Sequence, residues 1–89
     1  MIRETIRVVN STGLHARPAA ALIKAVKKYE SSVTLINGDK TVVLKGLMGV
    51  LGAGVKGHSD IEIICEGNDE HDAMVEIKGL FSSGFGEKR

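Results

Sequence analysis

The sequence predicts an α+β domain in which helices cover one face of a mainly antiparallel sheet. Three observations lead to this fold class. Apolar and polar residues alternate with period two in the first segment and again near residue 61, as in half-buried strands. An Asn-Gly pair separates two β-branched runs, as in a hairpin. Two other segments place apolar residues three and four positions apart, as in helices. The expected order is βαββαβα, and 89 residues with 43% hydrophobic composition fit a single domain over residues 1–89.

The first half of the chain is expected to form a strand and then a helix. Residues 2–8 alternate apolar and polar side chains, and residues 10–13, Asn-Ser-Thr-Gly, have the composition of a turn. A helix is expected from Ala16 to Tyr29, because four apolar residues recur at helical spacing: Ala19, Leu22, Ile23 and Val26. Pro18 supports a nearby helix start, since a missing N–H costs nothing in the first turn.

The second half is expected to contain a hairpin, a short helix, a strand and a final helix. Residues 32–36 and 40–44 form the hairpin around Asn37-Gly38-Asp39, and the glycine-rich segment 46–54 can form a short helix. A strand follows, with Ile61, Ile63 and Cys65 on one face. The last helix starts after Asp69, and its apolar residues are Ala73, Ile77 and Leu80. The acidic run from Glu66 to Glu76 is interpreted as a solvated helix start, favoured by the helix dipole.

The net charge of +1 conceals an uneven distribution. Residues 1–58 carry a net charge of +6, whereas residues 59–89 carry −5. Such a division either steers an acidic partner to one face or is simply solvated. The total is low for a protein that binds duplex nucleic acid, and three aromatic residues (Tyr29, Phe81 and Phe85) leave little for stacking on bases. No nucleic-acid partner is therefore expected.

The chain gives no sign of membrane insertion or secretion. No apolar run approaches the roughly 18 residues that a transmembrane helix needs. The first five residues mix both charge signs with apolar side chains, unlike a secretory signal. We therefore expect a cytoplasmic protein.

Several patterns that resemble reactive or ligand-binding motifs do not have the context that their chemistry needs. Residues 52–57 fit G-x-G-x-x-G, but a strand follows them where a dinucleotide loop needs a helix. His58 and His71 have no further ligands at metal-site spacing, and both are expected to be solvated. The single cysteine, Cys65, is expected to be a small buried apolar residue. Neither a metal nor another cofactor is expected.

The strongest candidate site is His15 with Arg17. If a helix begins near residue 16, His15 lies at its N-cap or just outside it. There, free backbone N–H groups and the positive dipole end favour an anion and a neutral, nucleophilic imidazole. A phosphoryl group on that ring would be held by helix amides and by charge-assisted hydrogen bonds from Arg17. Spacing alone leaves open the alternative of an ordinary surface histidine near a helix start.

Three segments resemble a known family: Gly13-Leu14-His15-Ala16-Arg17-Pro18-Ala19, Lys45-Gly46-Leu47-Met48-Gly49-Val50 and Gly67-Asn68-Asp69-Glu70. The family is HPr, the histidine-containing phosphocarrier of the phosphoenolpyruvate-dependent phosphotransferase system, and the resemblance covers essentially the whole chain. It implies an open-faced β-sandwich, with a four-stranded antiparallel sheet and three helices on one face. The closing residues 80–85 also resemble the tail of the nitrogen-branch paralogue, NPr.

The resemblance implies a phosphocarrier rather than a stand-alone enzyme. His15 would accept a phosphoryl group on Nδ1 from phosphorylated enzyme I and pass it to the histidine of a IIA domain, in sugar transport or in the nitrogen branch. Arg17 would pair with the phosphate. The first two helices would form one docking surface for these partners, made of Ala20, Lys24, Lys27, Leu47, Met48 and Leu51.

One residue departs from the family pattern. Many HPr proteins have a regulatory serine at the start of the second helix, and here that position is Gly46. Glycine has no hydroxyl, so an HPr kinase cannot phosphorylate this position.

The alternative function is a regulatory binding module, in nitrogen-branch or catabolite signalling, that uses the same surface without feeding sugar transport.

Overall fold

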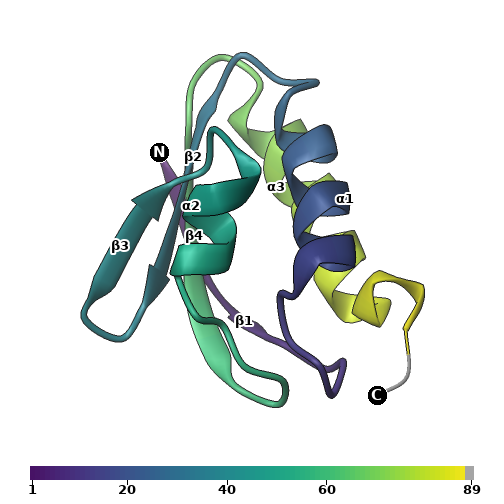
Figure 1. Cartoon of the computed structure of the whole chain (residues 1–89). Coiled ribbons are helices and arrows are strands. Elements are labelled where there is room, and N and C mark those ends of the chain that lie inside the picture. Colours follow the sequence, from purple (N-terminus) through teal and green to yellow (C-terminus); the bar gives the residue numbers. More distant parts are fainter. Residues whose placement is uncertain (88–89) are drawn as a thin grey trace.

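The computed structural model describes residues 1–87 of the chain (Figure 1). The expected domain also includes residues 88 and 89, which lie outside the described residues. The expected element order is confirmed, with one 3₁₀ turn (η1) after the last helix. The elements are β1 (Ile2–Arg7), α1 (Ala16–Val26), β2 (Ser32–Asn37), β3 (Lys40–Val43), α2 (Leu47–Gly52), β4 (Asp60–Glu66), α3 (Glu70–Ser82) and η1 (Gly84–Gly86).

The four strands form one antiparallel sheet in the order β1-β4-β2-β3. Figure 1 shows α1, α2 and α3 on the same side of this sheet, which confirms the expected α+β open-faced architecture. Alternation along the central strand β4 explains the arrangement, because Ile61, Ile63 and Cys65 are at most 2% exposed. Glu62 lies between them in sequence, and it pairs with Arg3 through two hydrogen bonds.

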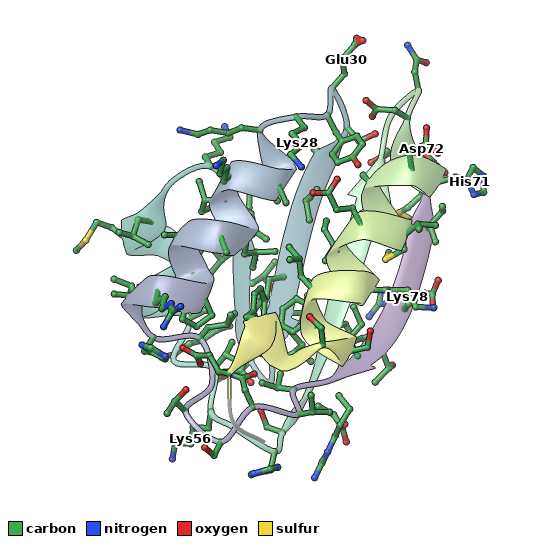
Figure 2. The ribbon with its side chains drawn as sticks, turned by 90° about the vertical axis from the view of Figure 1, so that its right-hand side faces the viewer. Lys28, Glu30, Lys56, His71, Asp72 and Lys78 are labelled. Atoms are coloured by element: carbon green, nitrogen blue, oxygen red, sulfur yellow. The ribbon has the colours of Figure 1, made fainter. Side chains whose placement is uncertain are left out.

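The core lies between the helices and the sheet. Figure 2 views the molecule from the helix side and shows α1 and α3 side by side over the strands, and the two helices are in contact. Leu22 of α1 and Ile77 and Phe81 of α3 have no exposed surface. Burial of each such side chain contributes about 1.5–3 kcal/mol, compared with about 0–1 kcal/mol for a surface ion pair. Apolar packing therefore holds α1, and the residues at its N-terminus, against the sheet.

Some predicted boundaries differ from those in the structure. The first helix ends at Val26 instead of Tyr29, although apolar spacing continues past Val26. The backbone N–H of Lys28 bonds to the carbonyl of Ala25 at 3.1 Å, and that of Tyr29 bonds to Val26 at 3.2 Å. These bonds span three residues, so the last turn tightens and the α-helix stops. The predicted strand ends at residues 8, 36 and 44 are each wrong by one residue, and the short second helix occupies residues 47–52 instead of 46–54.

The interpretation of the acidic run as simply solvated is wrong for three of its carboxylates. Asp69 accepts hydrogen bonds from the backbone N–H groups of Glu30 and Ser31, both at 2.9 Å. Glu70 pairs with the amino terminus at 2.9 Å. Glu76 accepts hydrogen bonds from Lys28 at 2.7 Å and from the Tyr29 hydroxyl. These acids connect α3 to β1 and to the segment after α1.

Candidate functional site

A tight loop before α1 fixes the place of His15. The backbone N–H of Gly13 bonds to the Asn10 carbonyl at 3.3 Å, and the Asn10 side-chain amide donates to the Gly13 carbonyl at 2.8 Å. Gly13 has a φ of +66°, and a Cβ there would lie 2.3 Å from the Val55 carbonyl oxygen, so this position requires glycine. Leu14 is 4% exposed and anchors the loop in the core. The next residue, His15, is left at the surface.

His15 is the N-cap residue of α1, as the sequence predicts. Its backbone is extended and its side chain makes no capping hydrogen bond, so the ring is available for other contacts. The first helical positions are Ala16, Arg17 and Pro18, and proline has no N–H. The first helical hydrogen bond runs from the N–H of Ala19 to the His15 carbonyl at 3.0 Å. The backbone N–H groups of Ala16 and Arg17 therefore have no partner in the helix. These amides and the dipole favour a bound anion.

Arg17 supplies an available positive charge next to this helix end. It is exposed and, within residues 1–87, its guanidinium forms no ion pair or hydrogen bond. A surface hollow of about 340 Å³ brings Arg17 and His15 together with residues of the preceding loop and of the C-terminal segment: Ser11, Thr12, Gly86 and Glu87. The structure thus places the two predicted site residues at one cavity.

Glu87 is a member of this site that sequence reasoning missed. Its carboxylate lies 2.9 Å (Oε2) and 3.1 Å (Oε1) from His15 Nε2. Oε1 also accepts hydrogen bonds from the Thr12 hydroxyl at 2.9 Å and from the Asn10 amide at 3.3 Å. The Thr12 hydrogen bond, followed by the contact with His15, holds the pKa of Glu87 below its ordinary value of 4.5. Nothing in the spacing of Glu87 signals this contact, because the two residues are 72 positions apart.

The residues predicted for docking lie on α1 and α2, which contact each other. Ala20, Lys24 and Lys27 are exposed on α1. On α2, Met48 is 78% exposed and Leu47 is 38% exposed, whereas Leu51 is partly buried and packs against the core. Exposed cations and an exposed apolar side chain therefore occur on neighbouring helices near the site.

Gly46 is the N-cap residue of α2. Its extended backbone is open to any residue type, and a Cβ at this position would meet no atom within 4 Å. The short helix begins without a side-chain cap. The position is therefore exposed and spacious, but it has no hydroxyl group.

The other reactive residues, His58, His71 and Cys65, do not line this hollow. His58 and His71 are exposed, and no group of three or more His, Cys, Asp and Glu side chains within the described residues is arranged to hold a metal. Cys65 is fully buried, and burial raises the pKa of its thiol to about 11. Gly52 ends α2, and the chain leads from it into the antiparallel strand β4, so residues 52–57 do not open a helix. No helix within residues 1–87 is long and apolar enough to cross a membrane.

Residues 2–83 match a protein-family model described as PTS HPr component phosphorylation site. The match includes both predicted site residues and all of α1, α2 and α3 up to its C-cap. The class of protein that this fold defines is thus a component of the phosphotransferase system (PTS).

Individual relatives agree with this class over nearly the whole chain. The phosphocarrier protein HPr of Treponema pallidum is 36% identical over 88 residues, which cover 99% of this chain and 100% of the relative. A crystal structure of HPr from Thermoanaerobacter tengcongensis superposes with a TM-score of 0.94, 36% identity and full coverage of both chains. HPr from Bacillus anthracis gives a TM-score of 0.85 at 26% identity, covering 90% of this chain and 95% of the other. The chain belongs to the HPr family of phosphocarrier proteins.

Proposed function

We propose that this chain accepts a phosphoryl group on His15 from phosphorylated enzyme I and delivers it to the histidine of a IIA domain. The observation that carries the proposal is the position of His15, exposed at the N-cap of α1 beside an arginine that forms no ion pair within the described residues. Family membership supports the same activity and a cytoplasmic location.

The proposed acceptor atom is Nδ1. Nε2 faces the Glu87 carboxylate, whereas Nδ1 makes no hydrogen bond within residues 1–87. A new bond forms between Nδ1 and phosphorus while the donor's N–P bond breaks and its electron pair returns to the donor ring. Arg17 and the free amides at the start of α1 then offset the charge of the transferred group. Discharge to IIA follows the same steps with His15 as donor.

The surface around His15 suits transient contact with acidic partners. Lys24 and Lys27 extend the positive charge of Arg17 along α1, and Met48 offers an apolar contact on α2. Complementary charge speeds encounter, and a small interface permits the fast release that a carrier needs. We therefore propose that enzyme I and IIA both dock on Ala20, Lys24, Lys27, Leu47, Met48 and Leu51.

The decisive test is the variant His15→Ala, mixed with phosphoenolpyruvate and enzyme I. We expect complete loss of acid-labile phosphate on the protein. The fold should persist, with a stability change within about 0.5 kcal/mol, because the side chain is exposed and does not cap the helix. Circular dichroism checks the fold. His71→Ala is the matched control, since His71 is exposed on α3 (Figure 2). This variant should take up phosphate as wild type does, because His15 is intact.

Two outcomes would contradict the proposal. Phosphate on the His15→Ala variant would place the acceptor elsewhere. A wild-type protein that enzyme I charges but that no IIA domain discharges would favour the regulatory binding module. Adding sugar-branch and nitrogen-branch IIA domains in separate reactions assigns the branch.

A further inference from the structure

We propose that Glu87 is a positioning residue for His15: its carboxylate holds the ring through Nε2–H and thereby keeps Nδ1 as the reactive nitrogen. The inference rests on the proposed function and extends it to a residue outside the family match, which ends at residue 83. Three observations carry it: the atoms in contact, the hydrogen bonds that hold the Glu87 carboxylate, and the structure of the C-terminal segment. A chemical argument about the charge that the reaction produces adds to them.

The contact between Glu87 and His15 fixes the protonation pattern of the ring. An ionised carboxylate only accepts hydrogen bonds, so in the 2.9 Å contact between Nε2 and Oε2 the hydrogen must be carried by Nε2. A neutral imidazole carries one N–H, and with that hydrogen on Nε2 the lone pair lies on Nδ1. Contact with both carboxylate oxygens also restricts rotation of the ring.

The carboxylate is itself held in place. Thr12 and Asn10 donate hydrogen bonds to Oε1, and Asn10 has no exposed surface. Asn10 also fixes the loop before α1 through the Gly13 carbonyl. These bonds favour the ionised form, in agreement with the lowered pKa of Glu87. One buried asparagine therefore connects the position of Glu87 to the loop that presents His15.

The C-terminal segment is shaped to bring Glu87 to this place. After α3 the chain turns back toward the N-terminal end of α1 (Figure 1). Phe85 has a φ of +55°, a region that non-glycine residues rarely adopt. Its ring packs edge-on against the buried Phe81, with ring centroids 4.9 Å apart. The backbone N–H of Glu87 bonds to the Gly84 carbonyl at 2.9 Å, which closes the turn.

The reaction produces a charge that the carboxylate can offset. When Nδ1 of a neutral ring bonds to phosphorus, the proton on Nε2 stays and the ring becomes an imidazolium. Glu87 lies against this Nε2, on the side of the ring away from Nδ1. The carboxylate therefore stabilises the positive charge without occupying the place of the incoming phosphoryl group.

The experiment compares wild type with Glu87→Gln and Glu87→Asp. Nitrogen-15 NMR of the ring, at about two pH units above the ordinary histidine pKa of about 6.5, reports which nitrogen carries the hydrogen. We expect wild-type His15 to be protonated at Nε2 and the glutamine variant to be a mixture, because an amide can donate as well as accept. Transfer from enzyme I should slow by about threefold to tenfold, the scale of the net contribution of one ordinary hydrogen bond. Glu87→Asp keeps a carboxylate on a shorter side chain, so its ring protonation and its transfer rate should lie between those of wild type and Glu87→Gln.

Two controls separate positioning from a general change in charge or fold. Glu30→Gln removes an exposed carboxylate at the opposite end of the molecule and should change neither signal (Figure 2). Phe85→Ala should loosen the segment and slow transfer, but this effect should disappear when Glu87→Gln is already present. Additive effects of these two substitutions would overturn the role of the segment.

The inference fails if Glu87→Gln leaves the ring nitrogens unchanged, or if it transfers phosphate at the wild-type rate. Failure of the proposed function looks different, because wild-type His15 would then carry no phosphate at all. The NMR measurement needs no phosphorylation, so it tests the contact independently of enzyme I.

Discussion

Arg17 in the first turn of α1 differs from Lys28, which follows the other end of this helix. Lys28 donates to Glu76 at 2.7 Å, whereas the Arg17 guanidinium has no such partner within residues 1–87. Its five N–H donors therefore need not break an existing ion pair before they bind a phosphoryl group. The planar fork also matches two phosphate oxygens at once, which a lysine cannot do.

The variant Arg17→Lys tests this role at the residue scale. It keeps the charge but loses bidentate binding, so we expect slower transfer from enzyme I and a shorter lifetime of the phosphohistidine. The loss should be about tenfold, compared with complete loss for His15→Ala. Rapid-quench kinetics and the decay of the phosphorylated protein measure both effects. Arg3→Lys is the control, since Arg3 is exposed on β1, outside the proposed docking surface. Wild-type kinetics for Arg17→Lys would contradict a phosphate contact.

The sequence predicts part of this site because two of its residues are local. His15 and Arg17 are two positions apart at a helix start, and the helix start is itself visible in the composition around Pro18. Glu87 is different, because its place depends on how α3 ends and on the turn at Phe85. A positive φ at a phenylalanine has no sequence signature, so the third member of the site requires the structure.

At the scale of elements, the strands and α2 were predictable but the end of α1 was not. Asn37-Gly38 identifies the hairpin, and the residue pattern places the strand ends to within one residue. The helical pattern of α1 continues through Lys27 and Lys28, so apolar spacing gives no reason to stop at Val26. The stop depends on backbone hydrogen bonds in the last turn, which side-chain periodicity does not report.

Gly46→Ser tests the start of α2. A serine at this N-cap can accept a hydrogen bond from a first-turn N–H, and the open space accommodates it without strain. We expect a gain of a few tenths of a kcal/mol, up to about 1 kcal/mol, in the free energy of unfolding. Urea denaturation measures this gain. Gly46→Ala is the control without a capping oxygen, and equal stability of the two variants would contradict the capping argument.

The same serine variant tests the absence of a regulatory hydroxyl. Incubated with an HPr kinase and ATP, the variant should gain phosphate in α2 and transfer more slowly through His15, because a dianion there repels acidic partners. Wild type should gain none between Leu44 and Leu51, a stretch without a hydroxyl side chain. Phosphate mapped to that stretch of wild type by mass spectrometry would refute the prediction.

At the scale of the whole molecule, acidic residues connect parts of the chain that are far apart in sequence. Asp69 joins the start of α3 to the segment before β2, and Ser31 at that junction is 5% exposed. The Ser31 hydroxyl is the main cause of the lowered pKa of Asp69, followed by the Glu30 N–H. The ordinary value is 3.8. The ionised Asp69 carboxylate therefore stabilises the folded state fully above pH 3.8. This stabilisation is lost as the pH falls through the lower pKa that Asp69 has in the folded protein.

We therefore expect Asp69→Asn to lower the thermal midpoint at neutral pH and to lose this difference in acid. The amide NH₂ of an asparagine would face one of the N–H groups that now donate to Asp69, so two donors would oppose each other. Thermal unfolding between about pH 7 and pH 2.5 checks this pattern, since the wild-type advantage should disappear as Asp69 becomes protonated. Asp72→Asn is the control, because Asp72 is exposed on the same helix turn. A constant difference at every pH would contradict the linkage.

The central place of β4 determines the order in which the molecule can assemble. β4 pairs with β1 on one side and β2 on the other, and the side chains of Arg3 and Glu62, which bond across β1 and β4, are 59 positions apart. During synthesis, only the β2–β3 hairpin can form from neighbouring residues, while β1 has no partner until residues 60–66 appear. Such distant pairing slows folding and leaves strand edges exposed to aggregation. A nascent chain that stops before residue 60 contains His15 and Arg17 but lacks the strand that joins β1 to the rest of the sheet.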